Sequence, residues 1–405
     1  MSKVEAYRKL KAPYGTVPSR QKAWRLHAAG LANLSCDEVS VSSPGPDELL
    51  ARVDAVGICA SDHKMISQGE AHSRMQGRNL KANPAIPGHE VSLTLVAVGA
   101  DLKKKFQVGR RYSVQADIYV DQVPMAFGYQ LAGADQQYVT IPPLVHEGGF
   151  LLPVDDKLSY SSVAVSEPWA CVLFSYENQR DTKSVKPGGT AWYMGCGPLG
   201  LMHIEKGIRD GAARVIVSEM KTDRLDYVRR TFGPLAESRG CELVTVDLNQ
   251  QKIDDVLPPK SCDDIIVVCP VAKAAEAALP FLSLRSFMNV FAGFPSRDAS
   301  NITLNLNDMH YGQWTLLATS GSPIESLQQV LDMASKGAID PNNSVAAVGG
   351  IGCVQEGIDL THKGVYPGRI VIYPQIDLPL TPVGDLTGGK PWTREAEEKL
   401  LESKL

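Results

Sequence analysis

The chain has 405 residues, of which 44% are hydrophobic and 21% are charged, and its formal net charge is −4. This length exceeds the size at which a single hydrophobic core stops growing, so we expect two domains. The small net charge provides no field that would gather nucleic acid or an anionic membrane. Charged residues, Gly and Pro interrupt every apolar run before it reaches the ~18–20 residues needed to span a bilayer. The composition therefore predicts a soluble, cytoplasmic protein with no nucleic-acid or membrane partner.

The first part of the chain predicts a β-rich domain. The segment before Trp24 is basic and has no apolar continuation, so we expect a solvated arm rather than a signal peptide. After it come short runs rich in β-branched residues, separated by Gly and Pro. The strands predicted from these runs are 49–56, 90–98, 111–116 and 136–141.

From residue 185 the chain alternates between predicted strands and helices. Such alternation implies right-handed crossovers and a parallel, doubly wound sheet. The predicted strands are 190–194, 214–218, 243–246, 264–269, 286–291 and 314–318, and the predicted helices begin at Pro198 and Thr222 or lie near 272–281.

The end of the chain is expected to rejoin the β-rich domain. A helix is predicted at 325–336 and a strand at 369–373, followed by a docked tail with a helix at 393–403. The predicted domains are therefore residues 1–165 with 325–405, and residues 166–324.

The stretch from Gly195 to Gly200 reads Gly-Cys-Gly-Pro-Leu-Gly between a predicted strand and a predicted helix. In that context Gly195 permits a tight turn, Gly197 lets the backbone approach a pyrophosphate, and Gly200 lets the helix pack on the strand. Pro198 and Leu199 open the helix, whose N-terminus favours phosphate charge. The stretch therefore predicts a dinucleotide site in preference to a glycine turn without a ligand.

Glu219 ends the next predicted strand, nineteen residues after Gly200. A carboxylate at this place accepts hydrogen bonds from the adenosine ribose and repels a 2′-phosphate, which favours NAD. Lys221 and Arg224 follow closely and could reach such a phosphate, so NADP stays open.

Candidate metal ligands lie in three short segments, with Cys59 in the first, His89 and Glu90 in the second, and Glu167 in the third. A thiolate, an imidazole and one or two carboxylates suit an open catalytic zinc site. None of the eight cysteines forms a Cys-x-x-Cys pair, so neither a zinc finger nor a disulfide framework is predicted. Each of these residues alone would be unremarkable. Their combination with a dinucleotide motif indicates a catalytic metal site.

These zinc and glycine motifs resemble those of the zinc-containing medium-chain dehydrogenases/reductases of the polyol (sorbitol) dehydrogenase type, over nearly the whole chain. Within that family the sequence is most similar to the L-sorbose-1-phosphate reductase group, through segments 291–293, 310–311, 319–321 and 378–382. The resemblance implies an α/β protein with a GroES-like β-rich catalytic domain and a Rossmann doubly wound parallel-sheet domain. It also implies a homodimer or homotetramer.

The resemblance assigns metal roles residue by residue. Cys59 and His89 match zinc ligands, and Glu90 matches an acidic neighbour that ligates directly or stands close behind. Glu167 matches a glutamate on the metal or its water, and which glutamate binds at rest stays open. Asp62 matches the carboxylate that holds the ligand histidine.

Further roles concern the proton and the cofactor. Ser61 matches the hydroxyl that touches the substrate oxygen, and its proton would pass towards Lys64 or His63. The family relay often ends in histidine, so Lys64 departs from the pattern. Ser320, in the resembling segment 319–321, and Arg224, which could reach a phosphate, are also expected to bind the cofactor.

Many relatives carry a four-cysteine lobe for a second, structural zinc, whereas the loop at 115–137 has no cysteine here. The expected cofactors are therefore one catalytic Zn²⁺ per chain and NAD, with NADP as the alternative.

The predicted activity is hydride transfer between NAD(P) and a secondary alcohol or ketone of a polyol, sugar or sugar phosphate, with zinc as Lewis acid. A phosphate would need cations, and a neutral polyol or other secondary alcohol would not. Two other classes stay open, a zinc-free quinone-reductase-like enzyme and a non-catalytic dinucleotide-binding protein. The candidate cations are Lys64, Arg74, Arg78, Lys81 and Arg297.

Overall fold

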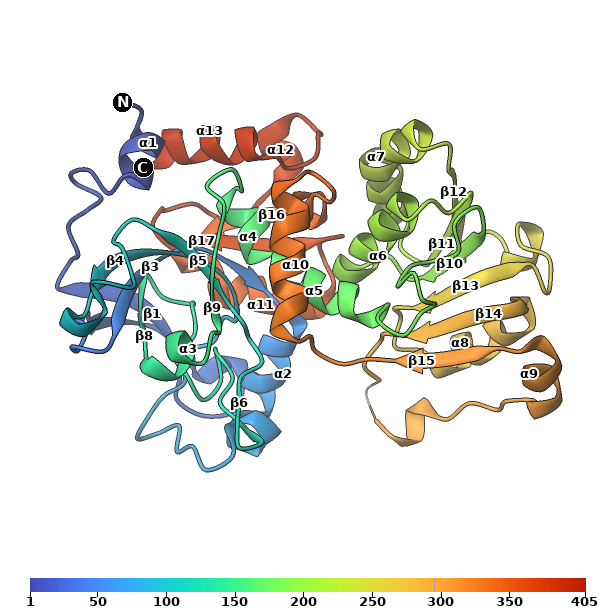
Figure 1. Ribbon diagram of the computed structural model, residues 1–405, viewed down its shortest axis with the longest axis horizontal. Coiled ribbons are helices and arrows are strands. Elements are labelled where there is room, and N and C mark those ends of the chain that lie inside the picture. Colours follow the sequence, from blue (N-terminus) through green and yellow to red (C-terminus); the bar gives the residue numbers. More distant parts are fainter. Residues whose placement is uncertain (295) are drawn as a thin grey trace. The chain divides into compact units, whose positions relative to one another are not determined.

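The computed structural model describes residues 1–294 and 296–405 (Figure 1). The chain forms two compact units. Unit 1 comprises Met1–Pro168 and Pro323–Leu405, and unit 2 comprises Trp169–Ser322. Unit 1 holds a mixed sheet and unit 2 a parallel sheet with helices, which gives the α/β class that the sequence predicts.

Unit 1 is built on an eight-stranded sheet with the order β18-β16-β17-β3-β4-β5-β9, in which β8 also pairs with β3. Two ribbons, β1 with β2 and β6 with β7, stand outside this sheet. The strands of unit 1 are β1 (Arg20–Leu26), β2 (Leu34–Ser40), β3 (Leu49–Ile58), β4 (Glu90–Val98), β5 (Arg111–Val114), β6 (Tyr119–Val120), β7 (Val123–Pro124), β8 (Tyr138–Ile141), β9 (Leu151–Pro153), β16 (Val345–Gly350), β17 (Arg369–Tyr373) and β18 (Thr381–Pro382).

Strand β3 lies at the centre of unit 1, and all ten of its residues are buried. A strand covered on both faces reads as a nearly continuous apolar run. The run in β3 is interrupted by Arg52 and Asp54, whose side chains pair with each other at 2.8 Å. The strand is therefore a rigid support for the residues that directly follow it.

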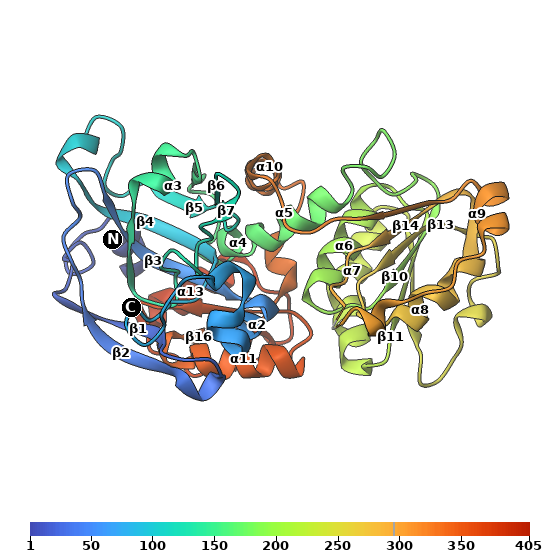
Figure 2. The ribbon, with the colours of Figure 1, turned by 90° about the horizontal axis from the view of Figure 1, so that it is seen from below.

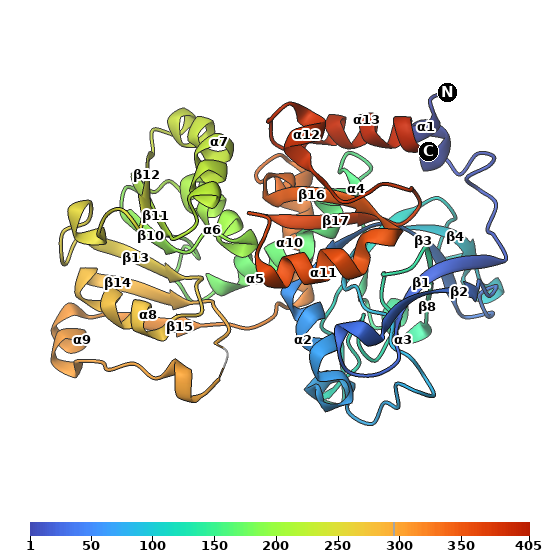
Figure 3. The ribbon, with the colours of Figure 1, turned by 180° about the vertical axis from the view of Figure 1, so that it is seen from behind.

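Helices of unit 1 cover this sheet, and α2 begins immediately after β3. Helix α11 lies beside α2 (Figure 3). The rings of His63 and His362 stack between the two helices, with centroids 3.6 Å apart. The helices are α1 (Lys3–Arg8), α2 (Ala60–Gln68), α3 (Pro143–Glu147), α4 (Tyr160–Ala164), α5 (Ser166–Ser175, which runs into unit 2), α10 (Ile324–Ser335), α11 (Val354–Lys363), α12 (Val383–Thr387) and α13 (Arg394–Lys404).

The first helix of the N-terminal segment, α1, is docked, so the prediction of a solvated arm is wrong for residues 3–8. Helix α1 lies beside the C-terminal helix α13 (Figures 1 and 3), and Arg8 pairs with Glu398 at 2.7 Å. Tyr7 is buried and donates its hydroxyl to Asp54 at 3.0 Å. The basic residues concealed this contact, because the buried Tyr7 and Val4 are too few to form an apolar run.

Unit 2 contains a six-stranded parallel sheet with the order β12-β11-β10-β13-β14-β15. The order runs outward in both directions from β10, so right-handed crossovers place α6 and α7 on one face and α8 and α9 on the other (Figure 2). The elements are β10 (Thr190–Met194), α6 (Pro198–Arg209), β11 (Arg214–Glu219), α7 (Thr222–Ser238), β12 (Glu242–Asp247), β13 (Cys262–Val267), α8 (Ala272–Ala278), β14 (Leu282–Val290), α9 (Leu306–Gly312) and β15 (Thr315–Ala318).

Among the described residues, no helix combines the length and apolar character that a membrane crossing requires.

Candidate active site

The candidate metal ligands of unit 1 come together where three neighbouring strands meet. In the antiparallel pairing of β3 with β4, Gly57 lies opposite Glu90, the first residue of β4. In the pairing of β17 with β3, Ile370 lies opposite Ile58. These registers bring Arg369, at the start of β17, and Cys59, directly after β3, to the same end of the sheet as Glu90.

One donor atom from each of Cys59, His89 and Glu90 lies within 4.8 Å of the other two. His89 and Glu90 are buried and Cys59 is partly exposed. The close approach requires glycine at position 57, because a Cβ there would come within 2.3 Å of Glu90 Oε2. Thiolate, imidazole and carboxylate form the donor set of a catalytic zinc site.

Asp62 orders two of these donors at once. Its Oδ2 accepts a hydrogen bond from the Cys59 backbone N–H at 2.9 Å, and its Oδ1 lies 3.0 Å from His89 Nδ1. A carboxylate on Nδ1 leaves Nε2 as the ring nitrogen for a metal. Ser61 Oγ lies 3.2 Å from that Nε2, so the hydroxyl is beside the metal-facing edge of the ring.

Glu90 is fully buried and keeps acceptor capacity. Its Oε1 lies 2.8 Å from Arg369 Nη2, yet among the described residues neither carboxylate oxygen has a hydrogen-bond partner. Burial raises the pKa of Glu90, and the charge of Arg369 opposes that rise. Arg369 engages Oε1 as an ion pair, whereas Oε2 is buried without such a contact to any residue that the structure describes, and a buried carboxylate oxygen of this kind can accept a divalent metal.

Glu167, near the start of α5, stands next to this group rather than within it. It is outside the set of donors that lie within 4.8 Å of one another. Burial raises its pKa, and its charge interacts with those of His89 and Cys59. Glu167 therefore lies near the donor group without belonging to it.

Three further residues of this site were not expected from the sequence. Arg369 pairs with Glu90, the buried Tyr129 has its ring centroid 5.8 Å from that of His89, and Asp135 is buried with neither carboxylate oxygen hydrogen-bonded among the described residues. Burial and the charge of Asp62 raise the pKa of Asp135. No local pattern marks these residues, because strand register and loop packing bring them to the site.

The side chains predicted to continue the proton relay beyond Ser61, Lys64 and His63, lie outside the group of metal donors. Lys64 lies on the exposed side of α2. His63 stacks on His362 of α11, and its Nδ1 is 3.4 Å from Ser67 Oγ.

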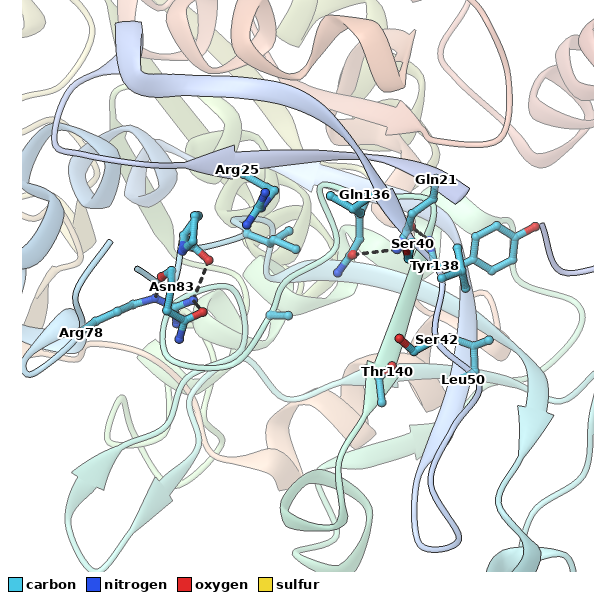
Figure 4. A pocket seen from close by; sticks show the side chains of 15 residues that line it. Gln21, Arg25, Ser40, Ser42, Leu50, Arg78, Asn83, Gln136, Tyr138 and Thr140 are labelled. Carbon is cyan, nitrogen blue, oxygen red and sulfur yellow. Dashed lines mark hydrogen bonds between the residues drawn. The ribbon is translucent and has the colours of Figure 1, made fainter. Parts of the chain in front are cut away.

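Arg78 has a structural role that differs from the predicted one. It lines a cavity of about 380 Å³ that is bordered by β1, β2 and β8 and lacks the metal donors (Figure 4). Its guanidinium donates to backbone carbonyls of Asn83, Pro84, Tyr129 and Gln130 at 2.8–3.0 Å. These contacts pin two loops together and use the donors that a phosphate would need.

In unit 2 the glycine-rich turn joins β10 to α6 as predicted. Gly195 has a φ of +100°, which favours glycine. A Cβ on Gly200 would lie 2.5 Å from the Gly195 carbonyl oxygen, so the close approach of helix and strand depends on its absence. Gly197 is the N-cap of α6, and Pro198 is its first residue, followed by Leu199. The backbone N–H groups at this helix start suit a pyrophosphate.

Glu219, at the end of β11, reaches this turn. Its Oε2 accepts from the Cys196 backbone N–H at 3.3 Å and lies 3.4 Å from Arg224 Nη1. Arg224 Nη1 is also 3.4 Å from the place of a Gly197 Cβ. Ser320 instead follows the edge strand β15, three strand positions from β10, so it does not share the turn.

Comparisons with known proteins agree with this arrangement. Residues 45–146 match the alcohol dehydrogenase GroES-like domain. A mannitol-1-phosphate 5-dehydrogenase of Aliivibrio fischeri is 28% identical over 396 residues, covering 88% of this chain and 92% of that protein. An L-sorbose 1-phosphate reductase of Klebsiella pneumoniae is 24% identical over 404 residues, covering 94% of this chain and 98% of that protein. The structure of 2R,3R-butanediol dehydrogenase from Bacillus subtilis has the same fold, with a TM-score of 0.70 at 19% identity, covering 87% of this chain and 99% of that one.

These likenesses define an alcohol dehydrogenase with a GroES-like domain and a parallel-sheet domain. Residues 45–146 are an alcohol dehydrogenase GroES-like domain, and the chain is similar over most of its length to polyol and sugar-phosphate dehydrogenases, in agreement with the predicted family. The relatives are dehydrogenases and reductases by name, and the donor group of Cys59, His89 and Glu90 fits a zinc ion.

Proposed function

We propose that the protein oxidises a secondary alcohol, or reduces the corresponding ketone, of a polyol, sugar or sugar phosphate, and that turnover depends on zinc. The observation that carries this proposal is the convergence of the Cys59, His89 and Glu90 donors, with the Ser61 hydroxyl beside the same imidazole. Two relatives that match nearly the whole chain are named for sugar-phosphate substrates, which supports the substrate class.

Cys59, His89 and either Glu90 or Glu167 would hold the zinc. When bound, zinc supplies a Lewis acid that polarises a carbonyl or acidifies an alcohol, and NAD(P) supplies or accepts the hydride. Asp62 keeps His89 oriented with Nε2 towards the donors. Arg369 balances the buried negative charge of Glu90. The same ion pair also fixes the orientation of this carboxylate.

Ser61 is the residue placed to exchange the proton of the substrate hydroxyl. Its Oγ lies 3.2 Å from His89 Nε2, so an oxygen next to this nitrogen is within its reach. The buried Tyr129 ring excludes water from this side of the imidazole.

A neutral polyol or other secondary alcohol is the alternative substrate. Two of the five candidate cations are engaged within the protein, Arg78 by backbone carbonyls and Arg74 by Asp117 at 2.5 Å. The chemistry at the metal donors needs no anion on the substrate.

The test combines metal content with turnover. Purified protein should contain about one zinc per chain, and chelation should abolish oxidation of hexitols, hexitol phosphates and simple secondary alcohols with NAD and NADP. Zinc should restore turnover, Mg²⁺ should not, and the circular dichroism spectrum should stay unchanged throughout. Full turnover by zinc-free protein would contradict the proposal and favour a quinone-reductase-like enzyme.

A further inference from the structure

Lys64 is the first of two cations that lie near the metal donors. It follows Ser61 by three residues on α2, so the two side chains share a face of the helix, with Cβ atoms roughly 5–6 Å apart. Lys64 is exposed, and it has no ion-pair partner within residues 1–294 and 296–405. An unpaired ammonium group one helical turn from Ser61 can meet an anion without first losing another contact.

Arg74 approaches the same site from the short 3-10 turn Ser73–Met75. Its guanidinium carbon lies 5.1 Å from the centre of the Tyr129 ring. The same ring is 5.8 Å from the His89 ring. One aromatic side chain therefore separates this cation from a metal ligand.

His72 is the neighbour that Lys64 and Arg74 share. Its Nδ1 accepts the Arg74 backbone N–H at 3.2 Å, and its ring stacks on Tyr129 with centroids 5.5 Å apart. Burial, together with the charges of Lys64 and Arg74, lowers the pKa of His72. His72 and Arg74 thus both contact the Tyr129 ring, and the charge of Lys64 acts on His72.

Asp117 offsets part of this positive charge. It lies 2.5 Å from Arg74 Nη2 and orients the guanidinium through one terminal nitrogen. A guanidinium has five N–H donors in a planar fork, so one carboxylate contact does not exhaust it. With a neutral His72, one net positive charge remains among Lys64, Arg74 and Asp117.

We propose that Lys64 and Arg74 bind the phosphate of a phosphorylated polyol or ketose whose reacting carbon lies at the Cys59 and His89 donors, an inference that rests on the proposed function. Arginine matches phosphate through paired N–H donors, and lysine adds a mobile point charge. Lys64 then acts through its charge and not as the end of a proton relay. The two residues determine specificity for phosphate esters over neutral polyols.

The test is the ratio of kcat/KM for a hexitol 1-phosphate to kcat/KM for the same unphosphorylated hexitol, measured on the zinc-loaded enzyme. Lys64→Gln and Arg74→Gln should each lower this ratio about tenfold, mainly through KM of the phosphate ester, and the double variant should lower it further. Arg74→Lys should recover part of the ratio, because it keeps a charge near Tyr129. A purely structural role for Arg74 would lower both kcat/KM values together.

Arg25→Gln is the matched control. The Arg25–Asp37 pair in unit 1 has side chains 31% and 26% exposed, against 28% and 16% for Arg74–Asp117. Arg25 lines the separate cavity of Figure 4, so its loss should leave the ratio unchanged.

The outcomes separate the two proposals. Turnover of both hexitols with an unchanged ratio in the Lys64 and Arg74 variants would overturn the phosphate site and leave the proposed function intact. If the wild-type enzyme oxidises none of the tested alcohols, the proposed function fails, and calorimetric titration with inorganic phosphate decides the inference. Phosphate affinity lost in the double variant would support the site, and equal affinity would overturn it.

Discussion

In unit 1 the metal donors come from separate places in the chain and meet where β3 ends and β4 and β17 begin. In unit 2 the glycine-rich turn is instead one continuous stretch between β10 and α6. The two sites also differ in the hydrogen bonds that their carboxylates accept. The Glu90 carboxylate of unit 1 is fully buried without a hydrogen-bond partner among the described residues, while Glu219 of unit 2 already accepts backbone N–H groups.

This difference shows how each site is held. The turn in unit 2 is a local conformation that forms with its strand and helix, and its ligand adds to contacts that are already satisfied. The donors of unit 1 are polar groups whose burial becomes favourable when a cation joins them. Changes in unit 1 should therefore have larger effects than similar changes in unit 2.

The largest effect is expected from Cys59→Ala. Loss of a thiolate ligand should empty the site of zinc and lower kcat/KM by at least about 10³-fold, since Lewis-acid stabilisation amounts to several kcal/mol. NADH affinity, measured by fluorescence titration, should change little because the turn lies in unit 2. Cys36→Ala, at an exposed cysteine of unit 1, is the control. Retained zinc and activity in Cys59→Ala would remove Cys59 from the site.

A smaller but measurable effect is expected on stability when one arginine of each site is removed. Arg369→Gln leaves Glu90 buried without its cation and should lower the free energy of unfolding by about 3–5 kcal/mol. Arg224→Gln breaks a longer ion pair, at 3.4 Å, beside a Glu219 that keeps its backbone donors, and should cost less than about 1 kcal/mol. Urea unfolding of both variants measures the two losses of unfolding free energy. Equal losses would contradict the expected difference between the two sites.

The third prediction concerns cofactor choice in unit 2. Glu219→Ala should shift the NAD to NADP ratio of kcat/KM towards NADP by about tenfold, on the scale of one charge-assisted hydrogen bond to the ribose. Arg224 would then be released towards a 2′-phosphate. Glu237→Ala, at an exposed position of α7, should leave the ratio where it is. If the ratio does not respond to Glu219→Ala, this carboxylate does not contact the ribose.

The last prediction is a pH dependence of stability that arises in the interior of unit 2. Burial lowers the pKa of His203 from 6.5 to about 3, and its Nδ1 lies 2.9 Å from the Tyr176 hydroxyl. The unfolded chain therefore binds a proton that the folded chain excludes, so stability present above pH 6.5 is lost as the pH falls towards 3. The contribution is about 1.4 kcal/mol per pH unit.

His203→Gln should reduce that slope between pH 6 and pH 4.5, as followed by urea unfolding at several pH values. His310→Gln, at an exposed histidine of the same unit, is the control. Identical slopes for His203→Gln and the wild type would show that His203 is not kept neutral by burial.

Several elements could be predicted closely because their signals are local. Strands β4, β10 and β17 coincide with the predicted 90–98, 190–194 and 369–373, and α6 and α7 begin at the predicted Pro198 and Thr222. The three strands are marked by β-branched runs or by an adjacent glycine, and α6 has a proline at its first turn. The β1–β2 ribbon was missed because polar residues outnumber apolar ones in both strands, and α11 was missed because it is short and contains Gly357.

The chemistry of the sites was determined by the sequence itself, since a thiol, an imidazole and a carboxylate have ligand properties wherever they lie, and a glycine turn forms from neighbouring residues. Only the tertiary structure decided which charges are compensated. Arg369 reaches Glu90 through the register of β17 on β3, and Arg74 reaches Tyr129 because loops far apart in sequence pack together. Such pairings depend on strand register and burial, which arise from the packing of the whole core and leave no trace in a short window of residues.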